Sequence, residues 1–268
     1  MTDEVGKVAI LTGGASLIGL AIAGRLVDAG VRVVVGDLDG SARGEVEAVV
    51  GGAGRYLCGD VADDAFLDLL ITAAVGDLGR LDHVITAPAI FDDDGYQSSW
   101  ELWHRALDVN TLAAARLTGK AAPHLPAGAS VVYVASVSGS TSQPHRMVYN
   151  VTKAALLMLA RTGAQALAAD GIRVNAVSPG WTWSRNIERR YGSREKADAF
   201  AAEFQPLGRM ADPDEIADAV MFLVSERASF ITGTNLAVDG GYGAIGPEAL
   251  GQAQQKHRPS PPDQTSPG

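Results

Sequence analysis

Cysteine is almost absent from this chain of 268 residues. The one cysteine, Cys58, has no partner for a disulfide within the chain, and no second ligand-type residue stands at metal-binding spacing from it. We therefore expect Cys58 to be a buried packing residue, and we expect no bound metal. The amino terminus also lacks a basic segment followed by an apolar core, which favours a cytoplasmic protein over a secreted one.

Basic residues and long apolar runs are also scarce. The 22 Lys and Arg residues stand against 31 Asp and Glu residues, which gives a formal net charge of -9. General binding to nucleic acids or anionic membranes depends on dense surfaces of Lys and Arg, so this balance argues against both. No uninterrupted apolar run approaches the roughly 18 residues that predict a membrane-spanning helix. The sequence therefore predicts neither a nucleic-acid partner nor a membrane partner.

Apolar residues, by contrast, make up 47% of the chain, enough for the core of one α/β domain. Short runs rich in Val and Ile alternate with segments of helical periodicity such as 18–30 and 212–226, which predicts repeated βαβ units. Strand runs without strict polar alternation are typical of a parallel sheet covered by helices on both faces. The expected strands are KVAIL (7–11), VRVVVG (31–36), RYLC (55–58), LDHVIT (81–86), SVVYVAS (130–136), IRVNAVS (172–178) and NLAVDG (235–240).

The composition changes near residue 247, where the chain becomes polar and rich in proline. Such a segment cannot bury enough apolar surface to offset the entropy lost on ordering. We therefore predict one domain over 1–246 and a disordered tail over 247–268.

The segment TGGASLIG, residues 12–19, joins the first expected strand to the first expected helix. Gly13 and Gly19 stand where such a turn would direct backbone amides and a helix dipole towards a pyrophosphate. Asp37 ends the next strand, where its carboxylate could accept hydrogen bonds from the ribose hydroxyls of adenosine. Neither Ser16 nor Leu38 is basic, so nothing is placed to hold the extra phosphate of NADP, and NAD is favoured.

With these features, the chain resembles the short-chain dehydrogenase/reductase superfamily from about residue 7 to residue 242. The motifs that carry the resemblance follow one another along the chain: TGGASLIG, GDV at 59–61, Asn110, ASVSG around Ser136, YNVTK at 149–153, VNAVSPG at 174–180 and ITGTNLAVDGGY at 231–242. The resemblance implies a single Rossmann-like, doubly wound α/β domain with helices on both faces of the sheet.

The resemblance also implies a site for NAD, with NADP less favoured. Asp60 and Val61 would bracket the adenine, and the segment from Pro179 to Ser184 would line the nicotinamide side. The cofactor-binding residues implied are Gly13, Ser16, Leu17, Ile18, Gly19, Asp37, Leu38, Asp60, Val61, Thr86, Tyr149, Lys153, Pro179, Gly180, Thr182 and Ser184.

Two departures from the family pattern face this cofactor groove. Leu17 replaces the middle glycine of the TGxxxGxG motif, and TAPA at 86–89 replaces the usual NNAG. A leucine adds bulk beside the pyrophosphate, and Pro88 removes a backbone N–H from the strand end. We expect Leu17 to weaken cofactor binding without abolishing it.

Tyr149 and Lys153 are four residues apart, so on a helix their side chains leave the same face. Lowering the pKa of a phenol by about three units requires about 4 kcal/mol of phenolate stabilisation, which the Lys153 ammonium and an oxidised nicotinamide could supply. The resemblance implies that Tyr149 is the general base or acid and that Ser136 bonds the reacting oxygen. It also implies that Asn110 distorts a helix and holds a water in the proton relay.

Aromatic residues make up only 6% of the chain, yet several follow Pro179, in the segment that lies over the substrate in the family. An apolar substrate pocket is one interpretation, and packing or subunit contact is the other. The residues concerned are Trp181, Trp183, Ile187, Tyr191 and Phe204, together with His145, Arg146 and Met147 before the YNVTK motif. The three acidic residues at 92–94 are interpreted as a solvated run rather than a metal site.

The sequence thus predicts an NAD-dependent oxidoreductase that interconverts a secondary alcohol and a ketone on a cyclic, aryl or hydrophobic substrate. An NADPH-dependent ketoreductase of the 3-oxoacyl type is the first alternative. The second alternative is a catalytically weak nucleotide-binding or regulatory protein of the same fold. The resemblance also implies a homotetramer that pairs the helices near 112–122 and 156–168.

Overall fold

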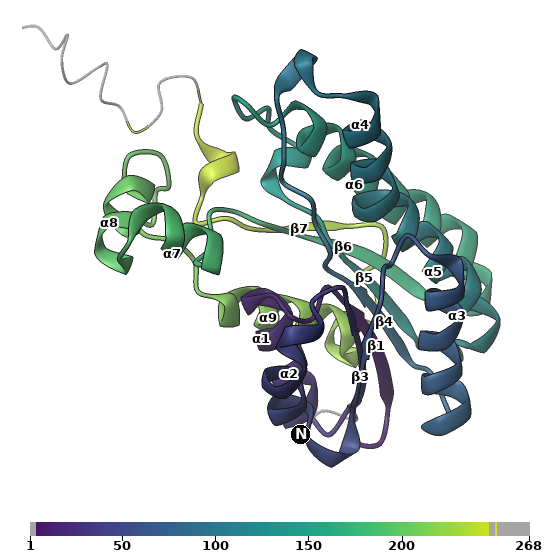
Figure 1. Ribbon diagram of the computed structural model, residues 1–268. Helices are drawn as coiled ribbons and strands as arrows, with labels where there is room; N and C mark the ends of the chain where they lie inside the picture. The colour runs from purple at the N-terminus through teal and green to yellow at the C-terminus, as the bar shows by residue number, and fades with distance from the viewer. Residues whose placement is uncertain (1–3, 247–249, 251–268) are drawn as a thin grey trace, which may run out of the picture.

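A seven-stranded parallel sheet forms the centre of the computed structural model, which describes residues 4–246 and residue 250 (Figure 1). The strand order is β3-β2-β1-β4-β5-β6-β7, so the chain reverses its direction of travel across the sheet between β1 and β4. Ligands of open α/β sheets bind beside such a reversal, at the carboxyl ends of the strands. The strands are β1 (Val8–Thr12), β2 (Arg32–Asp37), β3 (Arg55–Cys58), β4 (His83–Thr86), β5 (Ser130–Val134), β6 (Arg173–Pro179) and β7 (Asn235–Val238).

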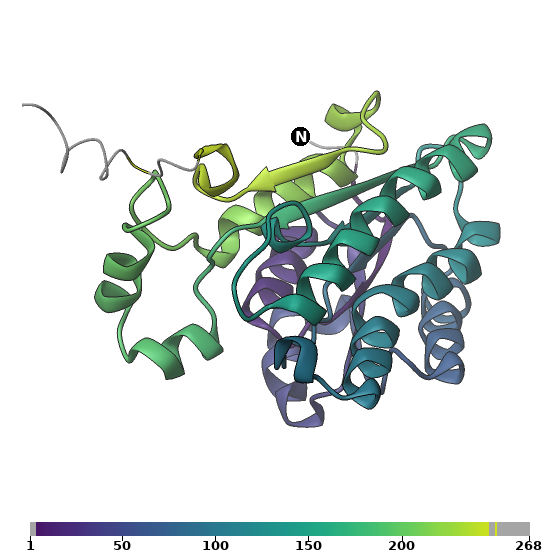
Figure 2. The same cartoon turned by 90° about the horizontal axis from the view of Figure 1, so that it is seen from above.

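Helices cover both faces of the sheet (Figures 1 and 2). One face packs against α1 (Leu17–Asp28), α2 (Arg43–Val50) and α9 (Pro213–Val224). The other packs against α3 (Asp64–Thr72), α5 (Ala113–Ala121) and α6 (Met147–Leu167), and α4 (Trp100–Leu107) runs into α5 through a π-helical turn, η5 (Asp108–Leu112). Each face of the sheet has its own hydrophobic core, and side chains along a strand alternate between the two faces. In β1, Ile10 packs in the core under α3, α5 and α6, and Leu11 packs in the core under α1, α2 and α9. The predicted doubly wound α/β fold with seven parallel strands is confirmed.

The helix beginnings show how local sequence fixes these elements. Ser16 caps α1 by accepting a hydrogen bond from the Gly19 N–H at 3.0 Å. Asp212 and Glu215 form a capping box at the start of α9. By contrast, Arg146 at the N-cap of α6 makes no side-chain capping bond, so the free amides of that helix need partners from elsewhere in the chain.

Cys58 is exposed, and the expectation that it is buried was wrong. It ends β3, which is an edge strand with a neighbour on one side only, so its outer positions are not covered. Its thiol instead lies 3.5 Å from the Leu38 carbonyl oxygen, to which it can donate.

Two short helices, α7 (Arg185–Tyr191) and α8 (Arg194–Ala201), form a cap that projects from the carboxyl edge of the sheet (Figure 1). The cap has a small core of its own around Ala197, Ala201 and Met210. Arg194 crosses it and pairs with Asp198 at 2.9 Å. The cap is therefore stabilised by its own contacts as well as by its connection to β6.

Of the described residues, none forms a helix with both the length and the apolar character that crossing a membrane requires. The predicted tail over 247–268 lies outside the described residues except for residue 250, so the domain boundary at 246 stays a prediction.

Candidate active site

A cavity of about 740 Å³ opens at the carboxyl ends of the central strands, beneath α7. Its size lies within the range of small-molecule and cofactor sites. Three of the predicted site residues, Gly19, Thr86 and Asn110, do not line it. The other predicted site residues all line the cavity: Gly13, Ser16, Leu17, Ile18, Asp37, Leu38, Asp60, Val61, Ser136, Tyr149, Lys153, Pro179, Gly180, Thr182 and Ser184.

The glycine-rich turn packs directly against the loop that follows β4. Gly13 has φ +75, and a Cβ there would lie 2.5 Å from backbone atoms of both Ala87 and Pro88. A Cβ on Gly19 would lie 2.3 Å from the Gly13 carbonyl oxygen. These two glycines are required by close backbone approach, and the TAPA segment is part of the same packed unit.

Leu17 is the first residue of α1, half-buried, and its φ is not in the left-handed region. The position therefore requires no glycine for its backbone conformation. The leucine changes the side-chain wall of the groove and leaves the amides at the start of α1 in helical geometry.

Asp37 and Asp60 line one end of the cavity, which we expect to hold adenosine and name the adenosine end, and Asp37 contacts the glycine-rich turn. Its Oδ2 accepts a hydrogen bond from the Ala15 N–H at 2.9 Å, and its Oδ1 accepts one from the Asp39 N–H at 3.1 Å. Nearby, Asp60 pairs with Arg105 at 2.7 Å. Each carboxylate is thus held in a fixed position at the groove wall.

Arg185 is a cation at the adenosine end that the sequence did not reveal. It begins α7 and lines the cavity, and its Nη1 donates to the Ala15 carbonyl oxygen at 2.7 Å. Its Nη2 pairs with Glu45 at 2.6 Å. The expectation that no basic group stands near this end was therefore incomplete, because Arg185 reaches the turn from a segment 170 residues away.

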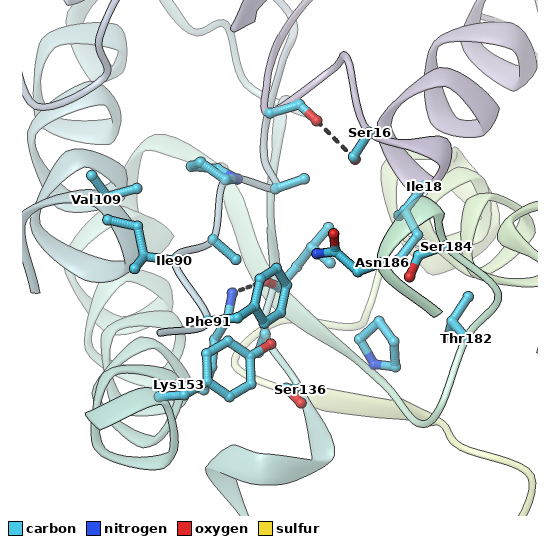
Figure 3. Close-up of a pocket in the computed structure, with 18 of the residues that line it drawn as sticks. Ser16, Ile18, Ile90, Phe91, Val109, Ser136, Lys153, Thr182, Ser184 and Asn186 are labelled. Carbon is cyan, nitrogen blue, oxygen red and sulfur yellow. Dashed lines mark hydrogen bonds between the residues drawn. The ribbon is translucent and has the colours of Figure 1, made fainter. Parts of the chain in front are cut away.

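Tyr149 and Lys153 project from the same face of α6, as their spacing predicted. Both are almost fully buried, and the Lys153 Nζ lies 5.6 Å from the centre of the Tyr149 ring. The ammonium donates to the Val134 carbonyl oxygen at the end of β5, at 2.9 Å. Figure 3 shows Lys153 and Ser136 on one side of the cavity, with Thr182 and Ser184 across from them.

Burial shifts the pKa of both groups. It raises the pKa of Tyr149 to about 12, while hydrogen bonding to the Ser136 hydroxyl and the charge of Arg146 act in the opposite direction. Burial lowers the pKa of Lys153 to about 7. The desolvated site therefore holds the phenol neutral, and making a phenolate requires positive charge beside it.

Asn110 lies in the π-helical turn η5 and clamps the loop after β4. Its Oδ1 accepts from the Ile90 N–H at 2.7 Å, and its Nδ2 donates to the Ile90 carbonyl oxygen at 3.1 Å. The same Nδ2 lies 3.0 Å from the Thr152 hydroxyl oxygen, one residue before Lys153. The predicted helix distortion at Asn110 is present, and its side-chain amide is bonded to protein groups.

The clamped loop then reaches Tyr149 in two ways. The Phe91 ring lies 5.0 Å from the Tyr149 ring, centre to centre. The Asp93 Oδ2 accepts from the Tyr149 backbone N–H at 3.2 Å, so a residue 56 positions earlier supplies the cap that Arg146 does not. The interpretation of 92–94 as merely a solvated run was incomplete, because Asp93 has this structural contact.

The aromatic residues after Pro179 divide between the two interpretations left open above. Trp181 and Ile187 line the cavity and also pack on the core of the cap. Trp183 and Tyr191 pack on the core of the cap and do not line the cavity. Phe204 is not in the lining either, and its ring lies 5.6 Å from the Trp181 ring, centre to centre. Of the three residues before the YNVTK motif, His145 and Met147 are not in the lining, whereas Arg146 is. Within the described ranges, His, Cys, Asp and Glu side chains form no group of three suited to a metal ion.

Comparison with known proteins gives consistent results. The family model described as Enoyl-(Acyl carrier protein) reductase matches residues 13–243. The chain is 34% identical over 245 residues to cis-4-hydroxycyclohexanecarboxylate dehydrogenase of Sinomonas cyclohexanicum, covering 89% of this chain and 97% of the relative. It is 33% identical over 267 residues to L-fucose dehydrogenase of Bos taurus, covering 97% and 98%. It is also 33% identical over 251 residues to 2,5-dichloro-2,5-cyclohexadiene-1,4-diol dehydrogenase of Sphingobium indicum, covering 91% and 100%.

These matches extend over nearly the whole chain and confirm the resemblance that the motifs carried. The parallel sheet, its groove at the strand ends and the YNVTK helix agree with them. The chain therefore belongs to the short-chain dehydrogenase/reductase superfamily and is an oxidoreductase that acts on CH–OH groups with a nicotinamide cofactor.

Proposed function

We propose that this protein interconverts a secondary alcohol and a ketone with NAD, and that Tyr149 accepts the hydroxyl proton during oxidation. The observation that carries the proposal is the geometry of α6: a buried ammonium lies 5.6 Å from a buried phenol ring in a cavity that Ser136 also lines. Burial lowers the pKa of Lys153, so keeping its ammonium charged at this position costs folding free energy. A catalytic role gives a physical reason for a lysine at such a position.

The groove fits a nicotinamide dinucleotide. The turn brings two glycines into contact with neighbouring backbone, and α1 begins at Leu17, which lines the cavity together with Ile18. Asp37 and Asp60 would hold the adenosine half, and Thr182 and Ser184 the nicotinamide half. When bound there, the oxidised cofactor supplies the acceptor for the hydride that leaves the carbinol carbon.

The protein's own residues would handle the proton. Ser136 orients the carbinol oxygen by a hydrogen bond while Tyr149, as the phenolate, takes the proton from that oxygen. Lys153 stabilises the phenolate by its charge and passes the proton on to water. Asn110 supports this relay by shaping η5 and by holding Ile90 and the loop beyond it. Reduction of a ketone follows the same steps in reverse.

A cyclic or otherwise hydrophobic substrate fits the lining of the cavity. Phe91, Trp181 and Ile187 contribute apolar side chains to the lining, and the Phe91 ring lies 5.0 Å from the Tyr149 ring, centre to centre. The printed names of two relatives are those of dehydrogenases of a cyclohexanecarboxylate and of a cyclohexadiene-diol. Both observations support a ring-bearing secondary alcohol.

The preference for NAD over NADP rests on Asp37, whose charge would repel a 2′-phosphate. Arg185 supports the alternative, an NADPH-dependent 3-oxoacyl-type ketoreductase, since its guanidinium also stands at this end. Glu45 already pairs with Arg185 at 2.6 Å and offsets its charge. We therefore expect the charge of Asp37 to determine the preference for NAD over NADP. The complete set of Ser136, Tyr149 and Lys153 argues against a catalytically weak protein.

We also propose a homotetramer. Leu112, Val151 and Met158, which lie on η5 and α6, leave large apolar side chains exposed on the outer side of the helix layer. Pairing these helices between chains would cover them. Light scattering at micromolar concentration should give the mass of four chains, and the mass of one chain would contradict the assembly.

A screen of secondary alcohols and ketones tests the proposed reaction. Each compound is incubated with the protein and NAD or NADH, and the nicotinamide absorbance is followed. Cyclic secondary alcohols should give steady reduction of NAD that depends on the protein. If no compound reacts although calorimetry shows that the cofactor binds, the proposed reaction is replaced by the second alternative, a catalytically weak nucleotide-binding protein.

A further inference from the structure

One guanidinium in the lining of the cavity is not engaged by a carboxylate. Arg105 and Arg185 each pair with a carboxylate, at 2.7 and 2.6 Å. Arg146 has no carboxylate oxygen within 4.0 Å among the described residues, and one of its N–H groups donates to the Phe91 carbonyl oxygen at 3.2 Å. A guanidinium carries five N–H donors, so most of those on Arg146 are left for another partner.

Arg146 also stands next to the reacting groups. It is the residue before α6, and Tyr149 lies three positions further on. Its positive charge acts to lower the pKa of the Tyr149 phenol, so it lies within electrostatic reach of that hydroxyl. The bond to Phe91 fixes it beside the ring that packs on Tyr149.

The acidic residues of the lining lie elsewhere. Asp37, Asp39 and Asp60 are at or just beyond the ends of β2 and β3, whereas Arg146 belongs to the segment between β5 and β6. Asp93, the acidic residue that contacts α6 at this point, is occupied by the backbone N–H groups of Tyr149 and Gly95. The acidic side chains of the cavity are therefore gathered at the adenosine end, and among the described residues the guanidinium of Arg146 at the catalytic end has no carboxylate partner.

We propose that Arg146 binds a carboxylate of the substrate, so that the preferred substrates are ring-bearing hydroxy acids and the corresponding keto acids. This inference rests on the proposed function, because it assigns the substrate class of the same site. Arginine suits the role, since its planar fork of donors matches the two oxygens of a carboxylate. The neutral side chains of Phe91, Trp181 and Ile187 would pack on the ring between the carboxylate and the carbinol.

A matched pair of substrates separates this role from an effect on Tyr149. The pair is a hydroxycyclohexane carboxylic acid and its primary amide, which have nearly the same shape and differ in charge. The wild-type protein should favour the acid, and Arg146→Gln should raise KM for the acid by about tenfold to a hundredfold while changing KM for the amide by about twofold or less. Arg146→Lys should recover part of the loss.

Equal losses of kcat/KM for acid and amide in Arg146→Gln would overturn the proposal, because they would mean that Arg146 acts only through Tyr149. A wild-type protein that oxidises the amide as well as the acid would overturn it too, while leaving the proposed function intact. Turnover of neither compound would count against the proposed function instead.

A binding measurement tests Arg146 without turnover. Cyclohexanecarboxylate has no hydroxyl to oxidise, and calorimetry can follow its binding to the full-length protein saturated with NADH. Binding should be weakened about tenfold or more in Arg146→Gln. It should be unchanged in Arg161→Gln, which removes one positive charge from an exposed position on α6. Similar binding to the wild type and to Arg146→Gln, with unchanged thermal unfolding, would refute the assignment.

Discussion

At the adenosine end of the groove both guanidiniums are paired with carboxylates and partly open to water, whereas at the catalytic end Lys153 is buried with no carboxylate paired to it among the described residues. The side chains of Arg105 and Arg185 are 39% and 44% exposed, and each guanidinium contacts a carboxylate. Lys153 is 2% exposed and bonds to a neutral carbonyl oxygen.

This difference separates two kinds of effect. Exposed pairs contribute little to stability, since water competes for the same groups, so changes at the adenosine end should act mainly on which cofactor binds. A buried charge without a paired carboxylate costs folding free energy and raises the reactivity of its neighbours. Changes at the catalytic end should therefore alter turnover and stability more strongly.

The largest expected effect is on turnover at the catalytic end. Tyr149→Phe removes the proton acceptor, and kcat should fall by about a hundredfold to ten-thousandfold. Cofactor affinity should change little, because the ring remains. Tyr133→Phe is the control: it removes a phenol hydroxyl that is equally buried but bonded to Thr118 in the core at 2.9 Å, and it should keep kcat. Comparable kcat in the wild type and Tyr149→Phe would remove Tyr149 from the mechanism.

The second effect is on stability at the same end. Lys153→Met should abolish activity and, at pH 7, raise the free energy of unfolding by about 2 kcal/mol, because a buried ammonium no longer has to be desolvated. The lost bond to the Val134 carbonyl oxygen offsets part of this gain, by about 1 kcal/mol.

The stability difference between Lys153→Met and the wild type should depend on pH in a definite direction. The folded pKa of Lys153 is about 7, below the unfolded value of about 10.4, so the unfolded chain binds the extra proton between these two pH values. The wild type therefore gains stability as pH rises through that window, and the advantage of Lys153→Met should shrink. The raised pKa of Tyr149 contributes stability that is lost only as pH rises from about 10 towards 12, so it does not oppose this trend at lower pH. Denaturant unfolding at pH 7 and pH 9 measures the difference, and an advantage that grows with pH would contradict the assigned cause.

At the adenosine end, removing the charge of Asp37 should change cofactor choice. In Asp37→Asn the ratio of kcat/KM for NAD to that for NADP should fall about tenfold, which corresponds to about 1.4 kcal/mol. Asparagine can keep an oxygen that accepts from the Ala15 N–H, so the turn is preserved. Asp37→Ala should lower the ratio too but also weaken both cofactors. An unchanged ratio in Asp37→Asn would shift the discrimination to Arg185 and Glu45.

How much of this arrangement the sequence reveals depends on how far apart the partners lie along the chain. The strands, the turn at 12–19 and the shared face of Tyr149 and Lys153 follow from periodicity and short spacing, and the structure has them. Contacts between distant segments leave no local pattern. The bond from Arg185 to the Ala15 carbonyl oxygen is such a contact.

Cys58 and the aromatic residues of the cap show a second limit. A cysteine at the end of an apolar strand reads as core, but the strand order makes β3 an edge and leaves that position exposed. The two tryptophans after Pro179 both pack in the cap, but Trp181 also lines the cavity and Trp183 does not. Spacing alone does not separate these roles, because they depend on which way the cap turns each side chain.

Asp93 lies in the loop after β4 and holds the start of the catalytic helix α6, because its carboxylate accepts a hydrogen bond from the Tyr149 N–H. Asp93→Ala should cost about 1 kcal/mol of unfolding free energy, because the Tyr149 N–H loses its partner at the start of α6. It should lower kcat a few-fold by loosening Tyr149, with KM for the cofactor unchanged. Asp92→Ala, which changes the adjacent carboxylate, is the control and should change neither quantity. Equal effects of the two variants would mean that loop charge, rather than the cap, is responsible.

The smallest effect concerns Leu17 at the turn. Its backbone is already helical, so the leucine leaves the amides at the start of α1 in place and adds only bulk to the groove wall. We expect such bulk to weaken cofactor binding equally in the ground state and the transition state, which would raise KM for NAD and leave kcat nearly unchanged. Leu17→Gly should therefore tighten NAD binding several-fold, by about 1 kcal/mol or less.

Leu17→Ala separates bulk from backbone freedom, because it removes the side chain without adding the conformational entropy of a glycine. It should tighten NAD binding at least as much as Leu17→Gly, as measured by calorimetry. The outcome that would reverse the interpretation is equal or weaker NAD binding in both variants. Because Pro88 and Ala87 pack directly on Gly13, that result would mean that the TAPA loop and Leu17 have adapted to each other, and that the leucine is a working part of the cofactor wall.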